Sequence, residues 1–253
     1  MGRIEGSRSA RVAALAAFLV ALPAMVKAQS FDTDFLFGPP RASLSVRGGL
    51  AFANAGSDIF SDSRELFTLE RGDFNGLTLG ADLGVRITPR LDFVAGIGVA
   101  HASAGSEYRD WEGEDDRPIE QRTSFTRVPV TGGVKAYVTP RGREIGRFVW
   151  IPARAALYAT GGGGLLWYRF AQSGEFVNIE SLDIVQDELS SSGFTPTVYA
   201  GVGGEFTVSE RFALAVEGRY SWGSARLDPI AFGDFEPIDL AGLSTTVGFL
   251  VRF

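Results

Sequence analysis

Residues on which several protein classes depend are scarce in this sequence, whose 253 residues include no cysteine and a single histidine. The absence of cysteine excludes disulfide bonds, thiolate metal sites and cysteine nucleophiles, and with them a small secreted domain held together by disulfides. Long hydrophobic runs are missing as well. After Val26 the sequence has no run of about 18 uncharged residues, and the longest candidate, 155–168, contains four consecutive glycines. Transmembrane helices are therefore not expected after Val26.

The first 28 residues have the pattern of an export signal. Arg3, Arg8 and Arg11 form a positive start, and the stretch 12–26 is apolar apart from Pro23. Val26-Lys27-Ala28 supplies residues suited to cleavage, so we predict a signal peptide over 1–28, followed by a short periplasmic segment over 29–41. An uncleaved anchor helix is the alternative, but the apolar stretch is shorter than the roughly 20 residues that span a bilayer.

Basic residues are in the minority, with 24 lysines and arginines against 30 aspartates and glutamates. Removal of the predicted signal peptide leaves 20 basic and 29 acidic residues, a net charge of −9. Nucleic-acid binding requires basic patches that neutralise phosphate, so an acidic exported chain is a poor candidate for it.

Alternation of apolar residues with a period of two is the strongest pattern in the sequence. Leu79, Ala81 and Leu83, for example, alternate with Gly80 and Asp82. The pattern recurs in eight segments, which we predict to be strands: 44–52, 77–87, 91–99, 127–138, 149–159, 197–208, 212–222 and 243–253. Most are long enough to cross a 25 Å apolar band when tilted, which takes about ten residues. Strands of a soluble β-sandwich are mostly shorter, at about five or six residues.

The links between these segments alternate in length. Two are tight turns, at 88–90 and 209–211, and one, near 139–146, is moderate. Four are long: 54–75, 102–124, 171–193 and 225–241. This alternation is typical of outer-membrane barrels, in which short turns face the periplasm and long loops face outside. We therefore predict an all-β fold, a transmembrane antiparallel up-and-down β-barrel of about eight strands over 42–253, with both termini periplasmic.

The last strand, 247–253, alternates apolar residues and ends in phenylalanine: Val247, Phe249, Val251 and Phe253. This ending resembles the signal by which the barrel-assembly machinery recognises its clients. Together with the strand and turn pattern, it makes 42–253 similar to the small eight-stranded outer-membrane barrels of the OmpA/OmpX type and their opacity-type and OmpW-like relatives. The resemblance implies residence in the outer membrane, contact with its lipid and lipopolysaccharide, and assembly by that machinery.

Charged residues fall on the face of the strands opposite the apolar one, where we predict a lumen charge network of Arg47, Asp82, Arg86, Lys135, Arg154, Glu205, Glu217 and Arg219. Isolated charges in a dry interior are very costly, so such groups must pair or meet water. A packed network is the favoured interpretation because an eight-stranded lumen is only wide enough for side chains. A polar passage for solutes is the alternative.

Two further patterns could carry chemistry. His101 and Ser103 resemble part of the histidine–serine pair of lipid A deacylase barrels, with Glu107 or Asp110 as the orienting carboxylate. The motif lacks the expected asparagine, because Ala104 follows Ser103, and it lies far from the C-terminus. Acidic clusters at 112–116 and 180–188 could bind divalent cations, but they lack the spacing of an EF-hand loop. We predict no catalytic residue, no metal site and no cofactor.

The sequence thus predicts an integral outer-membrane barrel with a closed or narrow lumen and a mainly structural or surface-interaction role. A narrow channel for small, hydrophobic solutes is the first alternative. A lipid-modifying enzyme that uses His101 and Ser103 is the second.

Overall fold

The computed structural model describes residues 36–112, 117–146, 148–177, 184–233 and 235–253. The chain divides into two compact units, 1–33 and 34–253, and every described residue belongs to the second. The predicted signal peptide lies outside the described residues, as does most of the segment 29–41. In chain order the elements are β1 (Leu36–Phe37), β2 (Ala42–Ala53), α2 (Asp58–Leu66), η2 (Arg71–Phe74), β3 (Gly76–Thr88), β4 (Leu91–Glu112), β5 (Pro118–Tyr137), β6 (Gly142–Ile145), β7 (Val149–Pro152), β8 (Ala155–Val177), β9 (Ile184–Thr207), β10 (Phe212–Trp222), β11 (Ser224–Ala225), α3 (Pro229–Phe232), β12 (Ile238–Asp239) and β13 (Gly242–Arg252).

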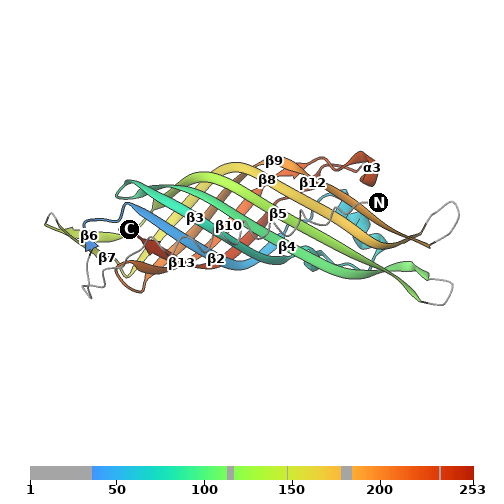
Figure 1. Ribbon diagram of the computed structural model, residues 1–253, viewed down its shortest axis with the longest axis horizontal. Helices are drawn as coiled ribbons and strands as arrows, with labels where there is room; N and C mark the ends of the chain where they lie inside the picture. Colours follow the sequence, from blue (N-terminus) through green and yellow to red (C-terminus); the bar gives the residue numbers. More distant parts are fainter. Residues whose placement is uncertain (1–35, 113–116, 147, 178–183, 234) are drawn as a thin grey trace, which may run out of the picture. The chain divides into compact units, whose positions relative to one another are not determined.

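Eight of these strands form a closed barrel in the order β10-β13-β2-β3-β4-β5-β8-β9. Every neighbouring pair is antiparallel, and the first and last barrel strands close the ring from Ala53 opposite Gly242 to Ser43 opposite Arg252. Figure 1 shows that the strands of the wall are tilted relative to the long axis of the barrel. Closure leaves no sheet edge in the wall, so all its backbone groups can bond within the protein. The predicted fold, an all-β up-and-down barrel of eight strands, is confirmed.

The predicted faces of the strands match the structure, because the apolar residues of each alternating segment point outward. Leu79, Val130, Val202 and Val216 are 62%, 53%, 67% and 47% exposed. The same belt carries aromatic side chains near its two margins, among them Phe206, Phe212 and Phe249 at one margin and Phe52, Tyr220 and Trp222 at the other. A continuous apolar exterior with aromatic girdles is the surface that a membrane-spanning barrel presents to lipid.

Two of the shorter strands set the height of this belt. Strands β10 and β13 have 11 residues each, which at about 3.3 Å per residue and a 40° tilt span roughly 28 Å. That height matches the apolar band of a membrane. Within the described residues, no helix has the length and apolar character needed to cross a bilayer.

One end of the barrel carries the short connections. The β3–β4 turn is Pro89-Arg90, the β9–β10 turn spans Val208–Arg211, and both Ala42 and Phe253 lie here, joined by backbone hydrogen bonds. The link between β5 and β8 differs from the prediction. Residues 149–152 are not part of a barrel strand but form β7, which pairs with β1 and β6 in a separate small sheet, and the barrel strand begins at Ala155. Figure 1 shows β6 and β7 beyond this end.

At the other end, two of the four predicted long loops are wrong. Strands β4 and β5 continue to Glu112 and Pro118, and β8 and β9 continue to Val177 and Ile184, so the segments 102–124 and 171–193 consist mainly of strand. Their neighbours β3 and β10 stop earlier, at Gly76 and Trp222. A four-stranded sheet therefore extends past the barrel rim, and at about 3.3 Å per residue the part of β4 from 102 to 112 covers roughly 35 Å. The outer faces of these extensions are mostly polar, so apolar alternation does not predict them as strands.

The four consecutive glycines, 161–164, lie within β8, where its neighbours come close. A Cβ on Gly162 would lie 2.2 Å from the carbonyl oxygen of Gly132, and one on Gly164 would lie 2.0 Å from that of Val130. The run thus serves barrel packing, because any side chain at these two positions would collide with β5.

Candidate functional site: a filled lumen and its outer cap

The lower part of the lumen, near the short turns, is organised around Glu205. This carboxylate is 1% exposed and accepts hydrogen bonds from the hydroxyl of Tyr137 at 2.7 Å, from Arg252 at 3.2 Å and from Lys135 at 3.4 Å. Beside it, Arg141 donates to Asp92 over 2.7 Å. Four strands and the β5–β6 link supply these groups, so the network ties the barrel wall across its interior.

A second layer lies nearer the middle of the lumen. Arg47 pairs with Asp82, and Arg219 donates to Glu217 at 2.8 Å while lying 4.0 Å from Asp82. The hydroxyl of Tyr158 completes the layer by donating to Glu217 at 3.0 Å. Aromatic faces also receive the cations, with Arg219 4.3 Å from the ring centre of Tyr199 and Lys135 4.2 Å from that of Tyr158.

We call these two layers the lumen network: Arg47, Asp82, Asp92, Lys135, Tyr137, Arg141, Tyr158, Glu205, Glu217, Arg219 and Arg252. Arg47, Asp82, Lys135, Glu205, Glu217 and Arg219 were predicted and lie together here. Arg86 is half-buried and lines the same small cavity as Glu205 and Arg252. Arg154 is a correction, since it is exposed in the bend before β8 and does not face the lumen. The displaced start of that strand accounts for the error.

Three inward charged residues that the sequence prediction omitted could have been found from alternation alone. Asp92 and Arg252 occupy inward positions in their strands, as does Arg127, which lies further along the lumen. Arg141 gave no such signal because it lies in a connection, where residue parity says nothing about direction.

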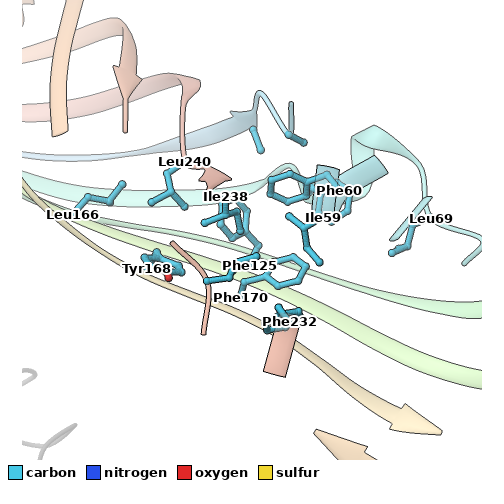
Figure 2. Close-up of a cluster of buried hydrophobic side chains, with 14 of the residues drawn as sticks. Ile59, Phe60, Leu69, Phe125, Leu166, Tyr168, Phe170, Phe232, Ile238 and Leu240 are labelled. Atoms are coloured by element: carbon cyan, nitrogen blue, oxygen red, sulfur yellow. The ribbon is translucent and has the colours of Figure 1, made fainter. Parts of the chain in front are cut away.

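The outer part of the lumen is filled by apolar side chains, which we call the loop plug: Ala53, Ala55, Ile59, Phe60, Phe67, Leu69, Phe74, Phe125, Leu166, Tyr168, Phe170, Leu227, Phe232, Ile238 and Leu240. Barrel strands β5 and β8 contribute inward-facing Phe125 and Phe170, and helix α2 packs Phe60 against both, with ring centres 5.5 and 5.7 Å away. Figure 2 shows Phe60 beside Ile59, and Phe125 and Phe170 close together with Phe232 of α3 alongside. Phe60 and Phe170 are both 0% exposed, so this layer excludes water.

Arg127 marks the boundary between the two fillings. Its guanidinium donates to the backbone carbonyls of Leu240 and Ala241, both at 3.4 Å, and packs against the ring of Phe125. A cavity of about 80 Å³, lined by Arg47, Arg127 and Arg219 among others, lies below the plug. Near Glu205 a cavity of about 10 Å³ remains. These gaps hold a few water molecules at most, and the apolar plug separates them from the outer surface.

The predicted histidine–serine pair lies outside the lumen. His101 and Ser103 both face outward on β4, at the margin of the apolar belt far from the short turns, and both are exposed. The ring of His101 lies 2.8 Å from the hydroxyl of Thr126 on the neighbouring strand, through Nδ1. A hydroxyl partner does not orient and charge an imidazole as a carboxylate would. The geometry therefore offers no support for a nucleophilic serine.

Of the acidic clusters, 113–116 and 180–183 lie outside the described residues. Glu188 pairs with Arg169 at 2.7 Å. Along the extended hairpins these carboxylates face a polar cleft of about 1000 Å³, lined by Glu107, Glu120, Arg122, Glu175, Asp187 and Glu188 among others. In the part of the chain that the structure describes, no three acidic or histidine side chains are placed to hold a metal ion.

No protein-family model matches the chain, and a search of curated proteins finds no match. Solved structures do match in fold. Neisserial surface protein A has 10% identity and a TM-score of 0.45, over 87% of this chain and 98% of its own. The outer membrane protein OprG of Pseudomonas aeruginosa has 14% identity and a TM-score of 0.41, over 85% and 98%. The N-terminal β-barrel domain of Pseudomonas aeruginosa OprF has 11% identity and a TM-score of 0.35, over 85% and 98%. The chain is thus similar to small outer-membrane barrels, while its fold is established by its own strand pairing.

Proposed function

We propose that this protein is an integral outer-membrane β-barrel that does not conduct solutes and presents its extended hairpins to partners outside the cell. The observation that carries the proposal is the filling of the lumen. Paired charged side chains fill the part near the short turns, and apolar side chains fill the part near the other end. A barrel sealed in this way contributes to the membrane as a rigid element and through its outer surface. The short-turn end, with Ala42 and Phe253, is the periplasmic end in this proposal, and the α2, α3 and extended-hairpin end faces outward.

The apolar belt supports the location. A soluble protein rarely exposes an apolar patch larger than a few hundred Å², whereas here outward apolar residues recur on all eight barrel strands. Lipid covers such a belt, and lipopolysaccharide is the lipid that the outward margin would meet in an outer membrane.

The conductance of single barrels in a planar bilayer tests the sealed lumen. We expect no steps from the natural protein. A variant with Phe60→Ser and Phe125→Ser, which makes the plug polar and smaller, should give small steps if the plug is the barrier. A matched variant of two outward residues, Leu66→Ser with Thr126→Ser, should stay closed. Conductance by the natural barrel would overturn the proposal in favour of a channel.

The alternating terminus also belongs to this proposal, since Val247, Phe249 and Phe253 face outward on the closing strand or just beyond it. We expect Phe253→Asp to lower the amount of assembled, heat-modifiable barrel severalfold while export continues. Arg211→Asp, an exposed change in the turn before β10, serves as the control. Normal assembly of the Phe253 variant would show that the terminal pattern is an ordinary strand end.

A further inference from the structure

A cavity of about 560 Å³ lies on the outer surface of the loop plug. Its floor is formed by buried plug residues Ile59, Phe67 and Phe232. The extended strands supply Tyr108, Phe176 and Leu189 to the lining. Its volume falls in the range of sites that hold small molecules, and aromatic and aliphatic linings are typical of such sites.

The polar groups of this cavity are predominantly acidic. Asp58, Asp62 and Gln172 line it together with the apolar residues. The two oxygens of Asp58 accept backbone N–H groups of Ile59 and Glu236, so this carboxylate fastens the start of α2 to the segment after α3. Asp62 lies one turn further along the helix, with Glu65 close enough to repel it.

The electrostatic surroundings of Asp62 favour a positive charge beside it. Burial, and then the carboxylates of Glu65 and Asp58, raise the pKa of Asp62 above its ordinary value. Arg64, on the same helix, donates instead to the carbonyl of Phe60 and to Ser61. The cavity therefore combines apolar walls with a negative potential at its edge, and aromatic rings such as Tyr108 and Phe67 favour a cation at their faces.

We infer that this cavity is a binding site for a small cationic amphiphile, in which an ammonium group meets Asp62 and an apolar body covers Ile59, Phe67 and Phe232. An anionic ligand would be repelled by three neighbouring carboxylates, and a fully polar one would leave the aromatic walls exposed to water. The site is an open cavity on the surface of the plug and does not depend on passage through the lumen. The inference goes beyond the proposed function, and neither stands or falls with the other.

Three probes of the same shape test the charge requirement: 4-phenylbutylammonium, 4-phenylbutan-1-ol and 4-phenylbutyrate. Each is titrated calorimetrically into the full-length barrel in phosphatidylcholine nanodiscs, with empty nanodiscs correcting for partition into lipid. We expect the ammonium to bind roughly five- to tenfold more tightly than the alcohol, as a partly desolvated charge contact allows, and the butyrate more weakly than both.

Variants then locate the site. Asp62→Asn should reduce the affinity for the ammonium to that for the alcohol and leave the alcohol unchanged. Ala231→Trp, which fills the cavity, should weaken both at least tenfold, with Ala231→Leu as a smaller filling change if the tryptophan variant fails to show heat-modifiable migration. Asp110→Asn, an exposed acid at the same end but outside the cavity lining, should change nothing. Equal binding of ammonium and alcohol by the natural protein, or binding unaffected by filling the cavity, would overturn the inference whatever the conductance experiment shows.

Discussion

The two halves of this lumen are both filled by side chains, but one half is charged and the other is apolar. Near the short turns, the lumen network fills the interior with charged groups, and Glu205 alone receives three donors. Toward the rim, the loop plug fills the same bore with rings that make no ion pair, such as Phe60 against Phe125 and Phe170. The charged half is built from the wall and from Arg141 of the β5–β6 link, whereas the apolar half depends on α2, α3 and the loops around them folding inward.

This difference predicts different consequences of damage. A charge lost from the network leaves its partners buried and unpaired, which is more costly than the pair was worth. A ring lost from the plug leaves a void, and the cost falls on the loops that close over it. The network should therefore govern the stability of the barrel, and the plug that of the cap.

The largest effect is expected for Glu205→Ala, which orphans Lys135 and Arg252 as well as the Tyr137 hydroxyl. We expect a loss of about 3–5 kcal/mol in the free energy of unfolding from lipid vesicles, measured by denaturant titration. Glu120→Ala, an exposed acid on β5, should cost less than about 0.5 kcal/mol. A cost for the Glu205 variant no larger than that of its control would mean that the network does not brace the wall.

Phe60→Ala should destabilise the cap by about 3–5 kcal/mol, the usual cost of emptying a buried phenylalanine site. Hydrogen exchange would show the loss in α2 and around α3, while the central amides of β10 and β13 keep their protection. Leu66→Ala, at an exposed position on the same helix, is the control. Equal loss of protection in the wall strands would contradict the separation of the two halves.

Val216→Arg places a charge on the outer belt, where Val216 stands opposite Val247 near the middle of its strand. We expect a cost of about 2–4 kcal/mol in the same lipid titration, because an arginine near the bilayer midplane loses its hydration. Thr131→Ser, on the lumen side, should be nearly neutral. Tolerance of arginine would mean that the faces are inverted, as a register slip of one residue would produce.

The smallest effect concerns the pH dependence of the cap. Because burial and neighbouring carboxylates raise the pKa of Asp62 in the folded protein, the cap binds this proton more tightly than the opened state does. The cap should therefore resist opening most strongly at a pH below the ordinary carboxyl pKa. The stability that the bound proton contributes should be lost as the pH rises through the raised pKa of Asp62. Limited proteolysis of α2 across this window measures it, and Asp62→Asn should flatten the dependence. A profile unchanged by this substitution would assign the effect to another group.

Alternation in the sequence was sufficient for most of the wall because most of its large apolar residues point outward. The segment 212–222 coincides with β10, and 77–87 lies within β3. Beyond the barrel rim this signal disappears, since both faces of a strand are then mostly polar or covered by loops. For that reason the sequence pattern predicts loops where β4, β5, β8 and β9 continue.

The plug was harder to predict because it joins residues from loops and strands far apart in the chain. Inward Phe125 lies between inward Thr123 and Arg127 on β5, and an apolar residue at such a position is a signal in retrospect. Ile59, Phe60 and Ser63 lie on one face of a nine-residue helix, but nothing in that pattern says that the face turns into a barrel. The error at Arg154 has a simpler reason. The sequence pattern predicts one strand over 149–159, whereas the barrel strand begins only at Ala155, after Arg154.

The seam between β2 and β13 has a consequence for how the barrel folds. It joins residues near opposite ends of the wall sequence, from Ser43 with Arg252 to Ala53 with Gly242, and the contacts that close the ring are therefore the least local ones in the molecule. Closing so long a loop costs chain entropy before any bond of the seam rewards it. Hairpins such as β3–β4 can form early, but the ring can close only after β13 has emerged. Until the ring closes, β2 and β13 are open edges able to pair with other chains. The interval between synthesis and closure is therefore when this protein is most exposed to aggregation.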